Sequence, residues 1–326
     1  MEKLICRIEN VEIDNQQPNS KPDMFDISQA TPAERVAALS LLFQAMPTEV
    51  RTAQVEEFLA GEERGEISFD GLLLAREGSQ IRGVMLSIMQ DDGTAFVWPA
   101  QAAGDTDRDT IIDALCETVA DRVDAGDIVS AQSILETDAT ADRAALNRNG
   151  FRHLADLFYL QRLLENPLPA RVDVALEVTK FSASRNEERF ARLVEQTYID
   201  TLDCPDFHEH RSGMEALASH RCSGDFAAER WNIYSADGRD VGMLLMNDHP
   251  AQDAWEVVYM GVAADARGCG YGRAMLIDGL YAAMNAGRQS VLLAVDSQNA
   301  PANRIYDELG FIEVASRAVH VLTSRR

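Results

Sequence analysis

One stretch, residues 255–273, constrains the fold more than any other part of the chain. Residues 255–262 are rich in β-branched and aromatic side chains, which predicts a strand, and residues 274–286 carry apolar side chains at helical spacing. The loop between them contains three glycines, which let backbone N–H groups approach an anion, and the helix start adds unpaired N–H groups and the positive end of its dipole. This strand, loop and helix predict a diphosphate-binding site.

Two other phosphate-binding motifs fit this loop less well. A P-loop ends in Gly-Lys-Ser/Thr, whereas here Gly272 is followed by Arg273 and Ala274. A dinucleotide fingerprint begins directly after its strand, but residues 263–267 intervene, and the third glycine comes one position early. Asp296, at the end of a later apolar run, is the acid that this second motif would use, so a nicotinamide-dependent oxidoreductase stays an alternative.

The pattern Val262-x-x-x-x-Arg267-Gly-x-Gly-x-Gly272 resembles the acetyl-CoA loop of the GNAT acetyltransferases. Residues 299–311 are similar to a second signature of that family, Asn-x-x-Ala-x-x-x-Tyr-x-x-x-Gly-Phe. The resemblance implies a mixed α/β fold and acetyl-CoA as co-substrate. It also implies which residues contact acetyl-CoA: Met260, Gly261, Val262, Arg267, Gly268, Cys269, Gly270, Tyr271, Gly272, Arg273, Asn299 and Asn303.

The same resemblance implies two catalytic residues. Glu256 matches the glutamate that serves as general base in histone-type members, and Tyr306 matches the tyrosine that donates a proton to the departing thiolate. An even offset of four places Glu256 on the same strand face as Met260, with Tyr259 on the opposite face as a core residue. The alternatives are a solvated or salt-bridged acid at Glu256 and a core aromatic at Tyr306.

The connection between the first two helices of a GNAT unit lines the acceptor pocket, so the resemblance makes residues 198–207 the substrate loop. Its candidate residues are Tyr198, Thr201, Asp203 and Cys204. His208 and His210 follow, but two histidines without a third ligand at a known spacing favour an exposed loop over a metal site, and we expect no metal.

Composition restricts the partners. The chain has 326 residues and a net charge of −23, which repels nucleic acid and anionic membranes. It has no apolar run long enough to span a membrane and no signal-peptide layout at its start, so we expect a cytoplasmic location. Five scattered cysteines without a Cys-x-x-Cys pair indicate reduced thiols.

The expected element order occurs twice. Helix and strand signals before residue 165 repeat those after residue 166, and Leu146-Asn-Arg-Asn-Gly-Phe151 resembles Tyr306-Asp-Glu-Leu-Gly-Phe311. The first copy of the cofactor loop has one glycine and two acids, Asp105 and Asp107, which oppose a diphosphate. We therefore expect two tandem GNAT-like domains, each with a mixed, largely antiparallel sheet flanked by helices: a degenerate domain over residues 1–165 and a catalytic one over residues 166–326.

This arrangement resembles the two-domain acetyltransferases of the mycothiol synthase type. The function predicted is an N-acetyltransferase that moves an acetyl group directly to a primary amine of a small molecule, since no nucleophile arrangement is recognisable. The alternative is a catalytically silent acetyl-CoA sensor or interaction module. The sequence does not identify the acceptor amine.

Overall fold

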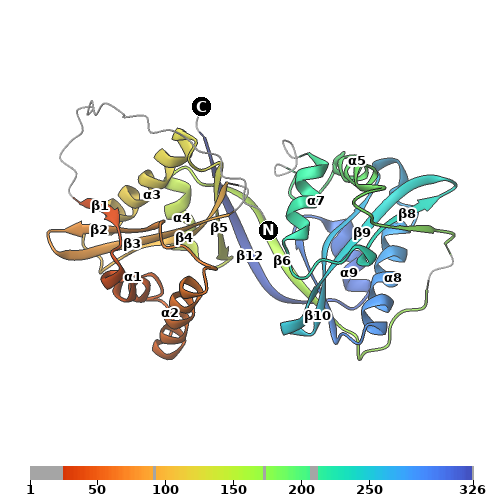
Figure 1. Ribbon diagram of the computed structural model, residues 1–326, viewed down its shortest axis with the longest axis horizontal. Coiled ribbons are helices and arrows are strands. Elements are labelled where there is room, and N and C mark those ends of the chain that lie inside the picture. Colours follow the sequence, from red (N-terminus) through yellow and green to blue (C-terminus); the bar gives the residue numbers. More distant parts are fainter. Residues whose placement is uncertain (1–24, 91–92, 172–173, 206–211, 325–326) are drawn as a thin grey trace.

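The protein folds around a single twelve-stranded sheet with the order β1-β2-β3-β4-β5-β12-β6-β11-β10-β9-β8-β7. The computed structural model describes residues 25–90, 93–171, 174–205 and 212–324. Helices gather into two groups at the two ends of this sheet (Figure 1). The predicted fold class, a mixed α/β fold with a largely antiparallel sheet flanked by helices, is confirmed.

The first half alternates strands and helices in the predicted order. A short edge strand, which the sequence did not predict, precedes the first helices and pairs with the next strand. The elements are β1 (Asp26–Gln29), η1 (Pro32–Glu34), α1 (Arg35–Leu42), α2 (Thr48–Glu63), β2 (Leu72–Glu77), β3 (Gln80–Met89), β4 (Thr94–Ala102), α3 (Arg108–Ala125), β5 (Ser130–Glu136), α4 (Thr140–Arg148) and β6 (Arg152–Leu163).

The second half repeats this series. Its elements are β7 (Glu177–Lys180), α5 (Glu187–Tyr198), α7 (Gly213–Arg221), η2 (Ala228–Arg230), β8 (Trp231–Ala236), β9 (Arg239–His249), η3 (Pro250–Gln252), β10 (Ala254–Val262), η4 (Ala264–Ala266), α8 (Tyr271–Asn285), β11 (Ser290–Asp296), α9 (Ala300–Glu308) and β12 (Ile312–Thr323). In each half one pair of neighbouring strands is parallel, β4 with β5 and β10 with β11.

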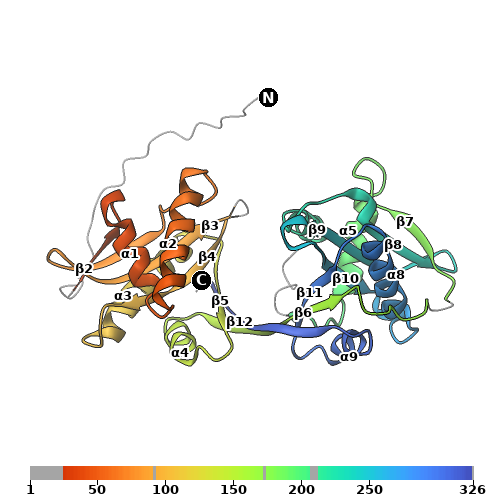
Figure 2. The ribbon, with the colours of Figure 1, turned by 90° about the horizontal axis from the view of Figure 1, so that it is seen from below.

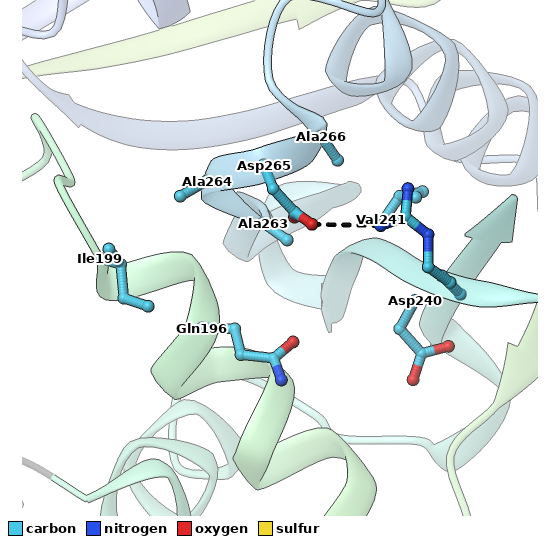
Figure 3. A pocket seen from close by; sticks show the side chains of 9 residues that line it. Gln196, Ile199, Asp240, Val241, Ala263, Ala264, Asp265 and Ala266 are labelled. Atoms are coloured by element: carbon cyan, nitrogen blue, oxygen red, sulfur yellow. Dashed lines mark hydrogen bonds and ion pairs between the residues drawn. The ribbon is translucent and has the colours of Figure 1, made fainter.

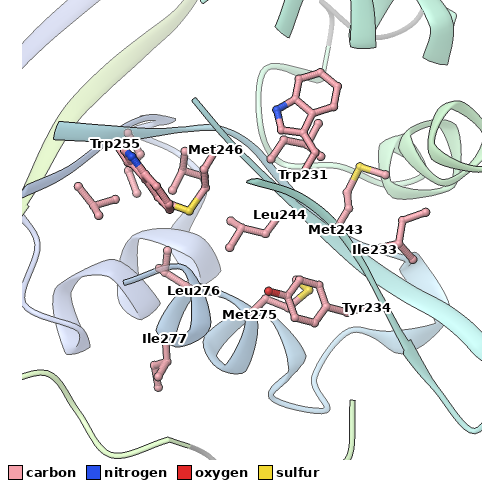
Figure 4. Packing of buried hydrophobic residues seen from close by; sticks show 14 of the residues in the cluster. Trp231, Ile233, Tyr234, Met243, Leu244, Met246, Trp255, Met275, Leu276 and Ile277 are labelled. Carbon is pink, nitrogen blue, oxygen red and sulfur yellow. The ribbon is translucent and has the colours of Figure 1, made fainter. Parts of the chain in front are cut away.

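Alternation along β9 gives the second half a core on each face of the sheet. Leu244 and Met246 lie against Gly279 of α8, where an added Cβ would be 2.7 and 2.8 Å from their side chains. Figure 4 shows both side chains beside Leu276 of the same helix. Asn247, one position further, points to the other face, where its amide donates to the His220 carbonyl at the end of α7. Helices α5 and α7 therefore cover the face opposite α8.

The last strand of each half is inserted into the sheet of the other half. β12 pairs with β5 of the first half, and β6 pairs with β11 of the second half. The two exchanged strands also pair with each other. Figure 2 shows β12 running from α9 across to β5. The sequence predicted both strands but not their exchange.

A buried arginine reinforces this exchange. Arg162 of β6 is 5% exposed, and its Nε donates to the carbonyl of Leu309 at 2.7 Å, just after α9.

Among the described residues, no helix combines the length and the apolar character needed to cross a bilayer. Residues 4–13, whose sequence pattern allows a strand, lie outside the described residues, as do His208 and His210.

Candidate active site

The sheet opens between β10 and β11. The two strands pair in parallel only from Ala254 with Ser290 to Val257 with Leu293, although β10 continues to Val262 and β11 to Asp296. Beyond Val257 the β11-facing edge of β10 therefore lacks a strand partner. Its N–H and C=O groups are available to an extended ligand, as at the edge of a sheet that accepts another strand.

A β-bulge at Val258 corrects the predicted orientation of two side chains. Glu256 pairs with Asn247 and Tyr259 with Leu245, with the register shift between Val257 and Tyr259. Because Asn247 and Leu245 are two positions apart, Glu256 and Tyr259 share the α5–α7 face, and Met260, paired with Leu244, faces α8. The even offset between Glu256 and Met260 does not put them on one face, and Tyr259 is not on the opposite face from Glu256.

A pocket of about 970 Å³ occupies the opening between the strands. Most residues predicted for acetyl-CoA or acceptor binding line it: Met260, Gly261, Val262, Arg267, Gly268, Gly270, Tyr271, Gly272, Arg273, Asn299, Tyr306, Thr201 and Asp203. Five predicted residues are not part of its wall: Glu256, Cys269, Asn303, Tyr198 and Cys204. One half of the chain thus supplies both predicted ligand sites to a single cavity.

The glycine loop holds its backbone N–H groups unpaired. Gly268 and Gly270 have φ of +80° and +81°, in the left-handed region that favours glycine, and Gly270 is the N-cap of α8. Within the described residues, the first hydrogen bond donated by an amide after Arg267 is that of Ala274, to the Gly270 carbonyl. Six consecutive amides, those of residues 268–273, are therefore free for an anion.

The two arginines of the loop are held by neighbours. The Arg267 guanidinium donates to the carbonyls of Thr197, Ile199 and Asp200 at 2.9, 2.7 and 2.9 Å, so it ties the end of α5 to the loop. Arg273 forms an ion pair with Glu308 at 3.3 Å. The sequence predicted both side chains beside the phosphates; the structure adds a positioning role for Arg267.

Helix α9 supplies the buried tyrosine of the pocket. Tyr306 is 6% exposed and packs edge-on against Phe311, with ring centroids 5.6 Å apart. Burial, and then the negative charge of Asp203, raise the pKa of its phenol. Asn299 caps this helix by accepting the Ala302 amide at 3.3 Å, and Asn303 donates to the Asp296 carbonyl at 3.0 Å. Both asparagines shape the start of α9.

Glu256 lies at the edge of the site in a polar network. One carboxylate oxygen, Oε2, accepts from the Ser223 hydroxyl and lies 2.7 Å from His249 Nε2, and the side chain is 27% exposed. His249 ends β9 and Ser223 follows α7, so two segments hold the carboxylate of a third, β10. This network orients Glu256 on the same face as Tyr259.

The loop after α5 is fastened to the end of β11 by reciprocal hydrogen bonds. Asp203 Oδ1 accepts the amide of Asp296 at 3.0 Å, and Asp296 Oδ2 accepts the amide of Cys204 at 3.2 Å. Burial, followed by the charges of Asp203 and Asp296, raises the pKa of the Cys204 thiol. Cys204 is thereby kept as a thiol, which is a poor nucleophile.

A second pocket, of about 520 Å³, lies between the end of α5, η4 and the start of β9 (Figure 3). Its charged residues are paired with each other or with α5: Arg239 with Asp265 at 3.3 Å, and Asp240 with Arg189. It has none of the free backbone amides of the larger pocket. Among the described residues, no group of three or more His, Cys, Asp and Glu side chains is placed to hold a metal.

The opened parallel strands, the loop of free amides and the buried tyrosine all border one cavity. Residues 194–311 match the family described as "Acetyltransferase (GNAT) family", and this part of the chain is a GNAT domain. The chain is also similar to "Mycothiol acetyltransferase" of Thermomonospora curvata, 30% identical over 169 residues that cover 51% of this chain and 54% of the relative. The corresponding protein of Actinosynnema mirum is 28% identical over 173 residues, covering 50% and 54%. The chain thus spans about half the length of these curated relatives.

A solved structure extends the likeness of fold to both halves. A GCN5-related N-acetyltransferase from Sphaerobacter thermophilus superposes with a TM-score of 0.62 at 17% identity, covering 93% of this chain and 96% of that one. A likeness at this identity concerns the fold alone.

Proposed function

We propose that the protein is an N-acetyltransferase that moves an acetyl group from acetyl-CoA to a primary amine of a small molecule. The observation that carries this proposal is the run of unpaired amides over residues 268–273 beside the open edge of β10. The amides fit a diphosphate, and the open edge fits the amide groups of a pantetheine arm. The pocket between them joins both to Tyr306.

We propose the roles of two side chains in proton transfer. Acetyl-CoA would supply the thioester, and Tyr306, which lines the pocket, would donate its proton to the departing thiolate. Glu256 would accept a proton from the acceptor nitrogen through water, because its carboxylate lies on the acceptor face but outside the pocket wall. Ser223 and His249 would hold it in place.

We propose direct transfer in a ternary complex, without an acetylated protein. Cys204, which follows the pocket residue Asp203, has a raised pKa and therefore little thiolate at neutral pH. Mass spectrometry after incubation with acetyl-CoA alone is expected to show an unmodified chain. An acetylated residue that passes its acetyl group to an amine would contradict this route.

For the first half, residues 1–165, we propose a GNAT-like unit without an intact cofactor loop. Its loop between β4 and α3 carries Asp105 and Asp107, whose charges oppose a diphosphate. Its contribution to the second half would be strand β6, which lies between β11 and β12. In this proposal the unit supports the site and binds no acetyl-CoA of its own.

Two measurements test the function. Calorimetry with acetyl-CoA is expected to give one site per chain, and thiol release is expected with some members of a panel of amino sugars, polyamines and amino acid amides. Binding without release for every amine would favour a silent acetyl-CoA sensor. Binding of a nicotinamide dinucleotide in place of acetyl-CoA would instead indicate an oxidoreductase.

A further inference from the structure

Three carboxylate side chains line the pocket, those of Asp200, Asp203 and Glu308. Asp203 belongs to the loop after α5, and it lines the same cavity as Tyr306 and Tyr259. Glu256 does not reach this wall. Of the three lining carboxylates, Asp203 is the one whose charge acts on Tyr306, so it is a candidate base on the cavity itself, unlike Glu256.

Hydrogen bonds with the end of β11 hold Asp203 in its position. Its Oδ1 accepts the Asp296 amide at 3.0 Å, while Asp296 in return accepts the amides of Cys204 and Gln298 at 3.2 and 2.8 Å. Two chain segments about ninety residues apart thus fix each other through their own carboxylates. A carboxylate that only closed the loop would not need to line the cavity as well.

The charge of Asp203 acts on both phenols of the pocket. Burial raises the pKa of Tyr306 most, and Asp203 is the only charged group of the described residues that adds to this rise. Burial also raises the pKa of Tyr259 most, and the charge of Asp203 raises it further. Asp203 thus lines the same cavity as Tyr306, the proposed proton donor, and its charge acts on that phenol. Asp203, as a base, and Tyr306, as an acid, thus line the same cavity.

The surroundings of Asp203 suit a base at neutral pH. Burial raises its pKa most, the amide of Asp296 lowers it, the charge of Asp296 raises it and a hydrogen bond from Asn299 lowers it. The groups that face it are these two residues, Cys204 behind it and the two phenols. A carboxyl group with a pKa above its ordinary value is closer to the optimum for proton transfer.

We propose that Asp203 binds the ammonium group of the acceptor and accepts the first of the two protons that its nitrogen loses. This inference rests on the proposed function. An N–H bond of the ammonium breaks and an O–H bond forms on Asp203; the freed lone pair forms the C–N bond while the C–S bond breaks. Tyr306 protonates the thiolate, and the second nitrogen proton leaves through water to Glu256.

The same geometry restricts the class of acceptor. A free amino acid would place its own carboxylate next to the Asp203 and Asp296 pair, where like charges repel. The three arginines that line the pocket are already paired, Arg267 with backbone carbonyls and both Arg273 and Arg304 with Glu308, so their charges are partly offset within the protein. The acceptor is therefore an aliphatic primary amine, cationic at its reactive nitrogen and without an adjacent carboxylate.

The first test compares matched variants. Asp203→Asn keeps an oxygen for the Asp296 amide but loses the charge, and it is expected to lower kcat/KM for the amine by about 10²-fold or more, with acetyl-CoA affinity within about twofold. It is also expected to remove the acidic limb of the pH profile of kcat/KM. Asp296→Asn is the control for loop closure, because one amide oxygen replaces two acceptors that hold two N–H groups. It also removes a charge that raises the pKa of Asp203, so its acidic limb is expected to move to lower pH and not to disappear.

The outcomes separate the proposals. If Asp203→Asn keeps the wild-type kcat/KM, or loses it in step with Asp296→Asn and with the melting temperature, Asp203 serves the loop and the inference is wrong. Glycinamide is expected to be a better acceptor than glycine by at least tenfold, and the reverse order would also overturn it. Wild-type protein that binds acetyl-CoA but releases no thiol with any amine overturns the proposed function itself, and this inference with it.

Discussion

At the scale of single residues, the sequence predicted most of the side chains that line the pocket, but it did not predict the face of the sheet on which Glu256 and Tyr259 lie. The glycines and Tyr306 stand in a pattern whose spacing fixes their place, and they line the pocket. The orientation of Glu256 depends on the bulge at Val258, which inserts one residue without a sequence signal of its own. Arg267 was predicted beside phosphates from its charge, but its partners lie about seventy residues earlier in the chain.

Tyr306→Phe tests the proton donor. Loss of the hydroxyl is expected to lower kcat by about 10²–10⁴-fold, because the thiolate then leaves unprotonated, with little change in acetyl-CoA affinity. The ring remains, so its edge-on contact with Phe311 and the melting temperature are preserved. Unchanged turnover in stopped-flow thiol release would make Tyr306 a packing residue.

Arg267→Lys tests whether the guanidinium positions the loop. Lysine keeps the charge but cannot donate to three separate carbonyls in one plane, so α5 is expected to loosen from the loop. We expect a melting temperature lower by about 2–4 °C and a higher KM for the amine. A variant with unaltered stability that loses only acetyl-CoA affinity would point to a phosphate contact instead.

At the scale of elements, periodic hydrophobicity was enough for the helices and strands of both halves. Helix α3, Arg108–Ala125, has apolar positions that recur at helical spacing, and Gly126 ends it with φ of +85°. Strand β1 was missed because its four residues are partly exposed and show no alternation of apolar side chains. The opening between β10 and β11 was also not predicted, since it depends on where pairing stops.

Gly270→Ala tests the glycine loop as an element. Gly270 and Gly287, which stand before and after α8, share φ of +81° and have no atom within 4 Å of an added Cβ. Alanine at either position costs about 1–2 kcal/mol of backbone strain. We therefore expect equal losses of stability for the two variants, but at least tenfold weaker acetyl-CoA binding for Gly270→Ala only. Equal binding in calorimetry would mean that the loop amides do not hold the ligand.

At the scale of the whole molecule, the exchange of β6 and β12 has no counterpart in the sequence pattern. Both strands carry alternating apolar residues after a helix and a Gly-Phe step, so either one satisfies an antiparallel neighbour of either half. The choice is made by tertiary contacts such as that of buried Arg162 with the Leu309 carbonyl. Sequence reasoning therefore gives two similar units but not their connection.

Separating the chain between residues 165 and 166 tests this connection. Each piece then carries a last strand that belongs in the sheet of the other piece. We expect neither piece alone to show cooperative unfolding by circular dichroism, and an equimolar mixture to recover it. An independently folded second piece with wild-type acetyl-CoA affinity would show that the exchange is dispensable.

The buried His320, on β12, predicts acid sensitivity at the junction of the two halves. Burial, then the neighbouring charges of His153 and Arg143, lower its pKa to about 4, with Asp156 opposing them. An unfolded histidine titrates near pH 6.5, so the unfolded state takes up a proton that the folded state resists. Stability is thus expected to fall as the pH drops from about 6.5 to about 4. His320→Leu should flatten this part of the melting profile, and an unchanged slope would exclude His320 as its source.

The exchanged strands also set the order of events during synthesis. Glu136 of β5 finds its partner Arg317 on β12 only 181 residues later, so the first half leaves the ribosome with one sheet edge exposed. It has to wait for the end of the chain before that edge is covered. A nascent protein in this state is open to mispairing with other copies, and holding chaperones are expected to matter more to its yield than to that of a single-unit relative.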